Sequence, residues 1–172
     1  MTASNFQRSL AAVLKDEGGN DDDPSDHGGR TSRGITQREY TAWLAQYKRP
    51  DTDVWGAPQA DVDQIYFDEY WLPECNDLPF GVDFQFFSMK VNAGPHQAII
   101  LLQRALGISD DGRIGPVTRA AIVKADPRQL VGQFYQHSRV FYQGLGQPKF
   151  LRGWLNRAAA DYALAVQMLE GK

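Results

Sequence analysis

Residues 17–36 read EGGNDDDPSDHGGRTSRGIT, and this stretch decides how the first part of the chain folds. The residues before it, 4–17, carry apolar side chains at helical spacing, which predicts an amphipathic helix that ends at Glu17. The two glycines after Glu17 are typical of a helix C-terminus. Further glycines permit positive φ angles and close backbone approach, so we expect residues 28–36 to form a small β-hairpin.

Glu17 continues the apolar stripe of the predicted helix, three residues after Leu14 and four after Val13. We therefore expect its carboxyl group on the buried side of the helix. Burial and the negative end of the helix dipole both disfavour the charged form and raise the pKa. A carboxyl group with a raised pKa suits a general acid near neutral pH. The alternative is a solvated carboxylate in the last helical turn, and the helix alone does not decide between the two.

Asp26 lies nine residues after Glu17, and Thr31 lies five residues after Asp26. A second carboxylate beside the acid would orient water or stabilise positive charge on a sugar, as glycoside hydrolysis requires. Asp26 also fits an Asx turn that caps the glycine-rich loop, and Thr31 fits a turn hydroxyl with a structural role. These residue types predict a glycosidase site with three catalytic candidates.

The aspartates at 21–23 and 26 also invite comparison with a calcium-binding loop. An EF-hand loop needs glycine at its sixth position and glutamate at its twelfth. Counted from Asp21, those positions hold Asp26 and Ser32. The pattern fails, so we predict no metal site and no cofactor.

The succession Glu17-Gly-Gly, Asp26, Gly-Gly, Thr31 and Gly-Ile-Thr resembles the signature of glycoside hydrolase family 108. Members of that family are muramidases that cut peptidoglycan, including phage endolysins and bacterial enzymes of secretion. The resemblance implies that Glu17 is the catalytic glutamate and that Asp26 and Thr31 complete the acid, Asp, Thr layout of phage-type lysozymes. The implied reaction is hydrolysis of the β-1,4 bond between N-acetylmuramic acid and N-acetylglucosamine.

The chain departs from the commonest family pattern at three positions. Asn20 stands where an aromatic residue is usual, and His27 and Arg30 replace the usual Pro and Ala. These changes bear on substrate contacts and not on the acid.

The resemblance continues downstream. Residues 86–95 and 102–116 look like the peptidoglycan-binding region that accompanies the family, including the runs Leu-Gln-Arg-Ala-Leu-Gly and Asp-Gly-Arg-Ile-Gly-Pro. The implied organisation is a catalytic lysozyme-like lobe at residues 1–79 and a helical peptidoglycan-binding lobe at residues 80–172, packed together as one globule. Prolines just before residue 80 mark the break between them.

The remaining sequence has the apolar spacing and the capping residues of helices. Thr36 and Glu39 form a capping box. Residues 61–72 and 82–93 follow the helical period, and the second segment is so apolar that we expect it at the centre of the core. Further helices are predicted to begin at prolines, which suit the first helical turn: Pro95, Pro116, Pro127 and Pro148. The sequence therefore predicts an all-α, lysozyme-like helical globule with a minor hairpin near residues 28–36.

Three further residues are candidates for substrate binding. Trp55, in a turn-rich stretch, would stack on a pyranose ring, and packing under the loop is its alternative role. Asn92, at a helix end, would hydrogen-bond a substrate acetamide, although a residue at a helix end needs no such role. Arg33, in the expected hairpin, is the third candidate.

Charge is distributed unevenly along the chain. Residues 1–79 carry 7 Lys and Arg against 15 Asp and Glu, a net charge of −8, and residues 80–172 carry 11 against 6, a net charge of +5. A basic half is attracted to the polyanionic wall, which fits catalysis in the first half and wall attachment in the second. Ordinary solvated surface charge is the alternative explanation. No basic stripe typical of nucleic-acid binding is present.

Composition also bears on location. The single cysteine, Cys75, permits no intrachain disulfide. We find neither a signal-peptide pattern nor a segment that could span a bilayer. We expect a monomer that is synthesised in the bacterial cytoplasm and acts on peptidoglycan in the periplasm or cell wall, after release through a holin or a secretion or tail machine.

Two rival functions stay open. A lytic transglycosylase also needs one acidic glutamate but leaves an anhydro sugar, and an inactive peptidoglycan-binding module would hold the wall without cutting it. A thiol peptidase is disfavoured because Cys75 lacks the sequence context of a nucleophile. A zinc amidase is disfavoured because the three histidines show no His-Glu-x-x-His spacing.

Overall fold

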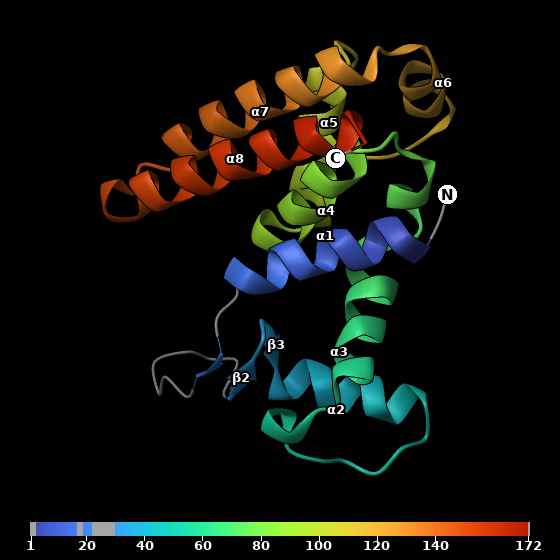
Figure 1. Cartoon of the computed structure of the whole chain (residues 1–172), viewed down its shortest axis with the longest axis vertical. Helices are drawn as coiled ribbons and strands as arrows, with labels where there is room; N and C mark the ends of the chain where they lie inside the picture. The colour runs from blue at the N-terminus through green and yellow to red at the C-terminus, as the bar shows by residue number, and fades with distance from the viewer. Residues whose placement is uncertain (1–2, 17–18, 22–29, 172) are drawn as a thin grey trace. The chain divides into compact units, whose positions relative to one another are not determined.

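The computed structural model describes residues 3–16, 19–21 and 30–171 (Figure 1). Eight α-helices and a three-stranded antiparallel sheet of two-residue strands account for most of this part of the chain. The predicted all-α, lysozyme-like fold with a minor β-hairpin is therefore confirmed. Across these described residues, no helix is both long and apolar enough to cross a membrane.

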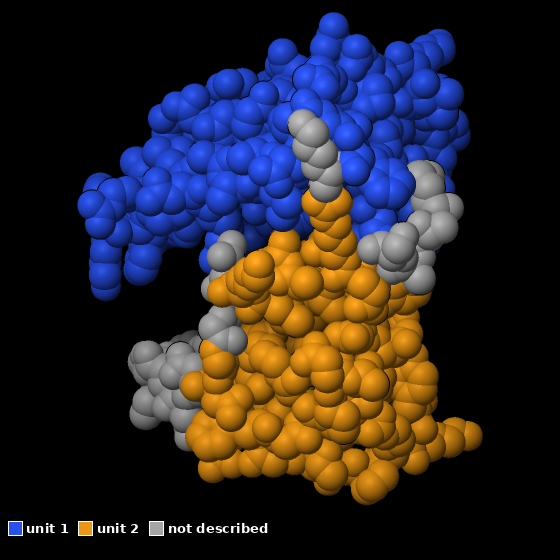
Figure 2. Space-filling model, in the orientation of Figure 1, with its two compact units in different colours: residues 1–5, 70–172 blue, residues 6–69 orange. Residues whose placement is uncertain are grey.

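The chain divides into two compact units, coloured separately in Figure 2. Unit 1 contains residues 1–5 and 70–172, and unit 2 contains residues 6–69. The first helix, α1 (Ala3–Asp16), begins in unit 1 and continues in unit 2.

Unit 2 is built on the apolar face of α1, where Phe6, Leu10 and Val13 are buried as the sequence predicts. The helix α2 (Gln37–Gln46) begins with the predicted capping box. The Thr36 hydroxyl accepts from the backbone N–H of Glu39, and the Glu39 carboxylate accepts from the backbone N–H of Thr36. The other elements of unit 2 are β1 (Asn20–Asp21), β2 (Thr31–Ser32), β3 (Ile35–Thr36), the 3₁₀ turn η1 (Val54–Gly56) and α3 (Gln59–Ile65).

The helix expected at residues 61–72 is interrupted. After α3 the chain continues as a π-helical segment, η2 (Tyr66–Trp71). A π turn holds one more residue than an α turn, so the side chains beyond it point in directions that a continuous α-helix would not give them. The residues at its two ends, Tyr66 and Trp71, are aromatic, and their side chains are almost completely buried.

Unit 1 is centred on α4 (Val82–Ala93), whose bounds and central position agree with the prediction. Its side chains are buried almost all round the helix, including three phenylalanines: Phe84, Phe86 and Phe87. The short 3₁₀ turn η3 (Glu74–Asp77) packs against α4. Four more helices each begin at a predicted proline: α5 (Pro95–Ala105), α6 (Pro116–Lys124), α7 (Pro127–Gly144) and α8 (Pro148–Leu169). The long helices α7 and α8 lie side by side (Figure 1).

Gln103, on α5, organises the loop that leads to α6. Its side chain is 1% exposed. The Nε2 group donates to Asp111 Oδ1 at 2.7 Å and to the Arg113 carbonyl at 2.9 Å, while Oε1 accepts from the Gly112 backbone N–H at 2.9 Å. One amide therefore links the Leu-Gln-Arg-Ala-Leu-Gly run to the Asp-Gly-Arg-Ile-Gly-Pro run.

Asp83 is a buried carboxyl group in the first turn of α4. Its Oδ1 accepts from the Phe84 backbone N–H at 2.7 Å, and its Oδ2 accepts from the side-chain amide of Asn5. Burial, the largest effect, raises the pKa of Asp83 from its ordinary 3.8 to about 7, against the opposing effect of these hydrogen bonds.

This raised pKa predicts a pH-dependent stability. Between about pH 4 and pH 7 the folded state holds a proton on Asp83 that the unfolded state has released, so stability falls as pH rises through this window. We expect the free energy of unfolding, measured with urea, to be lower at pH 8 than at pH 5 by on the order of 2–4 kcal/mol. Asp83→Asn should flatten this slope. Asp110→Asn, at a carboxylate whose pKa Arg104 lowers, should leave it unchanged; equal slopes in wild type and Asp83→Asn would contradict the assignment.

Candidate active site

The predicted hairpin forms between β2 and β3 and is closed by Arg33 and Gly34. Their φ angles are 51° and 79°, as a two-residue type I′ turn requires. Thr31 pairs with Thr36 on one side and with Asp21 of β1 on the other. Thr31 is thus half-buried in β2, the middle strand of the sheet, beside β1, which follows α1 in the chain.

Arg33 is held in its turn by contacts to a distant segment. Its guanidinium donates to the Ala57 carbonyl at 2.6 Å and to Gln59 Oε1 at 3.0 Å. Its own carbonyl accepts from the Tyr66 hydroxyl at 2.9 Å. These contacts give Arg33 a positioning role between the hairpin and the segment that carries Trp55. Its expected contact with substrate stays a prediction.

Trp55 projects from η1 and is 39% exposed, so the structure places it at the surface instead of under the loop. The Arg30 guanidinium lies 4.6 Å from the centre of its ring and 2.5 Å from an Asp53 carboxylate oxygen. Asp53 in turn caps η1 through the Trp55 backbone N–H. Sequence reasoning singled out Trp55 but missed this cluster. The Asp two residues before the Trp, a common cap spacing, was the available signal.

Gln37, the first residue of α2, fixes the segment around Trp55 to this helix. Its Nε2 donates to the Thr52 carbonyl at 2.9 Å, and its Oε1 accepts from the Val54 backbone N–H at 2.7 Å. The aromatic ring is therefore presented by a segment with fixed backbone contacts, as a binding platform requires.

Asp61 is a buried carboxylate of unit 2, and its contacts argue against an acid role. Arg49 donates to both of its oxygens at 2.8 Å, and the Tyr40 hydroxyl donates at 2.7 Å. The hydrogen bonds from Arg49 are the main cause that lowers the pKa of Asp61. A carboxylate held in its charged form cannot donate a proton to a leaving group.

Two of the three catalytic candidates, Glu17 and Asp26, lie outside the described residues. In the sequence, Glu17 comes between α1, which ends at Asp16, and β1, which begins at Asn20, and Asp26 comes between β1 and β2. The Gly19 carbonyl accepts from the Arg33 backbone N–H at 3.3 Å. The chain on each side of the Glu17 position is thus anchored within unit 2.

Asn92 lies near the end of α4 and belongs to unit 1. Its Nδ2 donates to the Ser88 carbonyl at 2.8 Å. It lines a pocket of about 140 Å³ together with aromatic side chains of α7 and α8, including Tyr142 and Trp154. Sequence reasoning missed these aromatic residues.

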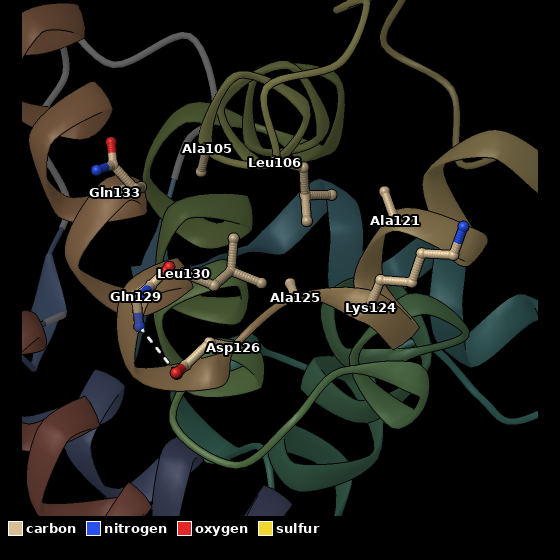
Figure 3. Close-up of a pocket in the computed structure, with 9 residues that line it drawn as sticks. All are labelled: Ala105, Leu106, Ala121, Lys124, Ala125, Asp126, Gln129, Leu130 and Gln133. Atoms are coloured by element: carbon tan, nitrogen blue, oxygen red, sulfur yellow. Dashed lines mark hydrogen bonds between the residues drawn. The ribbon is translucent and has the colours of Figure 1, made fainter.

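A larger pocket of about 330 Å³ lies among α5, α6 and α7 of unit 1 (Figure 3). Leu106 and Leu130 point into it, and its polar groups come from exposed side chains such as Lys124 and Gln133. The pocket is therefore open to solvent, with leucine side chains inside it and polar side chains at its edge.

Cys75 is buried, and its thiol donates to the Tyr70 carbonyl at 3.8 Å. Burial raises the pKa of this thiol. A buried, protonated thiol is a poor nucleophile, which argues against a thiol peptidase. Within residues 3–16, 19–21 and 30–171, no group of three His, Cys, Asp or Glu side chains is placed to bind a metal ion.

Comparison with known proteins gives two adjacent family matches. Residues 10–94 match the family described as glycosyl hydrolase 108, and residues 97–159 match the family described as a predicted peptidoglycan domain. The solved structure of SagA from Brucella abortus is similar at 29% identity, with a TM-score of 0.80 over 98% of this chain and 97% of that chain. No curated protein sequence matches.

Proposed function

Because the chain belongs to glycoside hydrolase family 108, we propose that it is a muramidase that hydrolyses the β-1,4 bond between N-acetylmuramic acid and N-acetylglucosamine. The coarse function, hydrolysis or binding of peptidoglycan, follows from the two matched domains. The observation that carries the finer proposal is the succession of a glycosyl hydrolase domain and a peptidoglycan domain in a single chain.

Glu17 is the proposed general acid, which protonates the leaving oxygen. The support is the buried apolar face of α1, where Phe6, Leu10 and Val13 lie, together with the sequence spacing that predicts the same face for position 17. Asp26, with Thr31, is proposed to orient the attacking water or to stabilise the positive charge that develops on the sugar. Thr31 supports this role by its place in the strand adjacent to β1.

Trp55, Arg33 and Asn92 are the proposed substrate contacts. Trp55 offers a partly exposed aromatic side chain, and Arg33 holds the segment that presents it. We also propose that residues 1–79 provide catalysis and residues 80–172 provide attachment, in a monomer that reaches the wall through a holin or a secretion or tail machine. The positive net charge of the second half supports attachment to a polyanionic wall.

Mass spectrometry of digested peptidoglycan tests the proposal. The full chain should release disaccharide-peptides with a free reducing end at N-acetylmuramic acid, because water is the acceptor in hydrolysis. Anhydro products, lighter by one water, would identify a lytic transglycosylase instead. An absence of soluble products together with binding to the insoluble wall would identify an inactive binding module.

A further inference from the structure

The small pocket near the end of α4 combines an amide with aromatic rings. Asn92 and Ala93 form one side, while Phe141, Tyr142 and Leu145 of the α7 end and Trp154 of α8 form the other. All of these residues belong to unit 1, and those from α7 and α8 fall within the segment that matches the peptidoglycan domain.

The aromatic rings continue from the pocket to the surface. The Tyr142 and Trp154 rings stack at 5.6 Å, and the Trp154 and Phe150 rings stack at 5.7 Å. Phe150 is 47% exposed, and Leu145 beside the pocket is also exposed. Large apolar side chains exposed together at one place mark a binding surface more often than isolated ones do.

The polar features restrict what this surface can bind. Asn92 Nδ2 donates to the Ser88 carbonyl, whereas the Oδ1 atom accepts from no donor among the described residues. Asn92 therefore offers one hydrogen-bond acceptor, Oδ1, to a ligand of the pocket. Lys149 Nζ lies 5.2 Å from the centre of the Phe150 ring, and Arg152 is exposed one turn along α8. An aromatic platform, one amide acceptor and flanking cations match a sugar with an acetamido group in a polyanionic chain.

We propose that this pocket is a subsite for an N-acetylated amino sugar of a peptidoglycan glycan strand, in addition to the catalytic site of unit 2. The inference rests on the proposed function for its choice of polymer. The pocket volume, about 140 Å³, is below the roughly 300–1,000 Å³ of pockets that enclose a whole small ligand. The acetamido group therefore enters the pocket and donates its N–H to Asn92 Oδ1, while the pyranose ring lies against the exposed Phe150 ring, which stacks on Trp154. The lactyl and stem-peptide carboxylates of the strand face Lys149 and Arg152.

Binding measurements on the full chain test this subsite. The background carries Glu17→Gln so that the probe is not cut, and the probe is N,N′,N″,N‴-tetraacetylchitotetraose, with cellotetraose as the analogue that lacks acetamido groups. Phe150→Ala and Asn92→Leu should each weaken binding of the acetylated probe, Phe150→Ala by roughly tenfold, as for a buried aromatic contact. Cellotetraose should bind more weakly than the acetylated probe and should not distinguish Asn92→Leu from its parent.

Phe80→Ala is the matched control, because Phe80 is a phenylalanine of unit 1 with similar exposure, 42%. It should bind as the parent does. Sedimentation with purified peptidoglycan should give the same ranking of variants, and circular dichroism should show the parent's helix content in each. Unchanged affinity in both Phe150→Ala and Asn92→Leu would overturn the subsite.

Two other ligands of this surface would give different experimental results. A second copy of the chain would appear as a dimer in sedimentation velocity that Phe150→Ala dissociates, and a lipid surface would appear as binding to anionic vesicles that Phe150→Ala abolishes. Either result without a change in glycan affinity overturns the proposal. Failure of the muramidase proposal is recognised separately, because it would appear as unchanged cleavage by Glu17→Gln, a measurement that does not involve this pocket.

Discussion

Glu17→Gln is expected to lower the rate of peptidoglycan hydrolysis by about 10²–10⁴-fold, the usual contribution of a general acid. Glutamine keeps the size and hydrogen-bonding shape of the side chain but has no proton of suitable acidity to give to the leaving oxygen. The rate is measured as release of soluble reducing sugar from purified peptidoglycan. Sedimentation with the insoluble wall should be unchanged, because attachment is assigned to other residues.

Glu69→Gln is the matched control for this variant. Glu69 is an exposed carboxylate of unit 2, so its replacement changes the net charge by the same amount without touching the proposed acid. We expect its activity to equal that of wild type. If Glu17→Gln retained activity within a few-fold of wild type, another residue would be the acid and the role assigned to Glu17 would be wrong.

Gln103→Leu is expected to destabilise unit 1 by about 3–5 kcal/mol, near the upper end for single substitutions. Leucine has a similar size but can neither accept from the Gly112 N–H nor donate to the Arg113 carbonyl. Each buried polar group that loses its partner costs about 1–3 kcal/mol. Urea denaturation followed by circular dichroism measures the loss.

The control for this variant is Gln167→Leu, at an exposed glutamine of α8. A substitution away from any such network usually changes stability by about 0.5 kcal/mol or less. Gln103→Leu with the same urea midpoint as Gln167→Leu would show that the loop before α6 does not depend on this amide.

Much of the helical framework was predictable because its signals are local. A proline fits only the first turn of a helix, so Pro116 and Pro127 fixed helix starts that the structure reproduces. The capping box of Thr36 and Glu39 depends on residues three positions apart and was confirmed in the same way. The interruption of the helix after Ile65 was not predicted, because its mark in the sequence is small: the buried residues Tyr66 and Trp71 are five positions apart instead of three or four.

The contacts that sequence reasoning missed connect distant residues. Arg33 was singled out for substrate binding, which stays a prediction, but its hydrogen bonds with Ala57 and Gln59, more than twenty residues away, were not predicted. The aromatic pocket likewise joins Asn92 to Trp154, whose proximity depends on how α4 packs with α7 and α8. Spacing along a chain marks the types of residue that chemistry requires, but only the packed helices bring these side chains together.

The discontinuity of unit 1 limits how the two halves could be exchanged between proteins. A segment that starts at residue 70 would contain Asp83 but not Asn5, the side chain that donates to it. Transplanting that segment as an autonomous attachment module would leave a buried carboxyl oxygen without its donor, whereas a graft that keeps the first turn of α1 would preserve the pair. Fusion partners and domain swaps based on the linear family boundary should therefore carry the N-terminus with them.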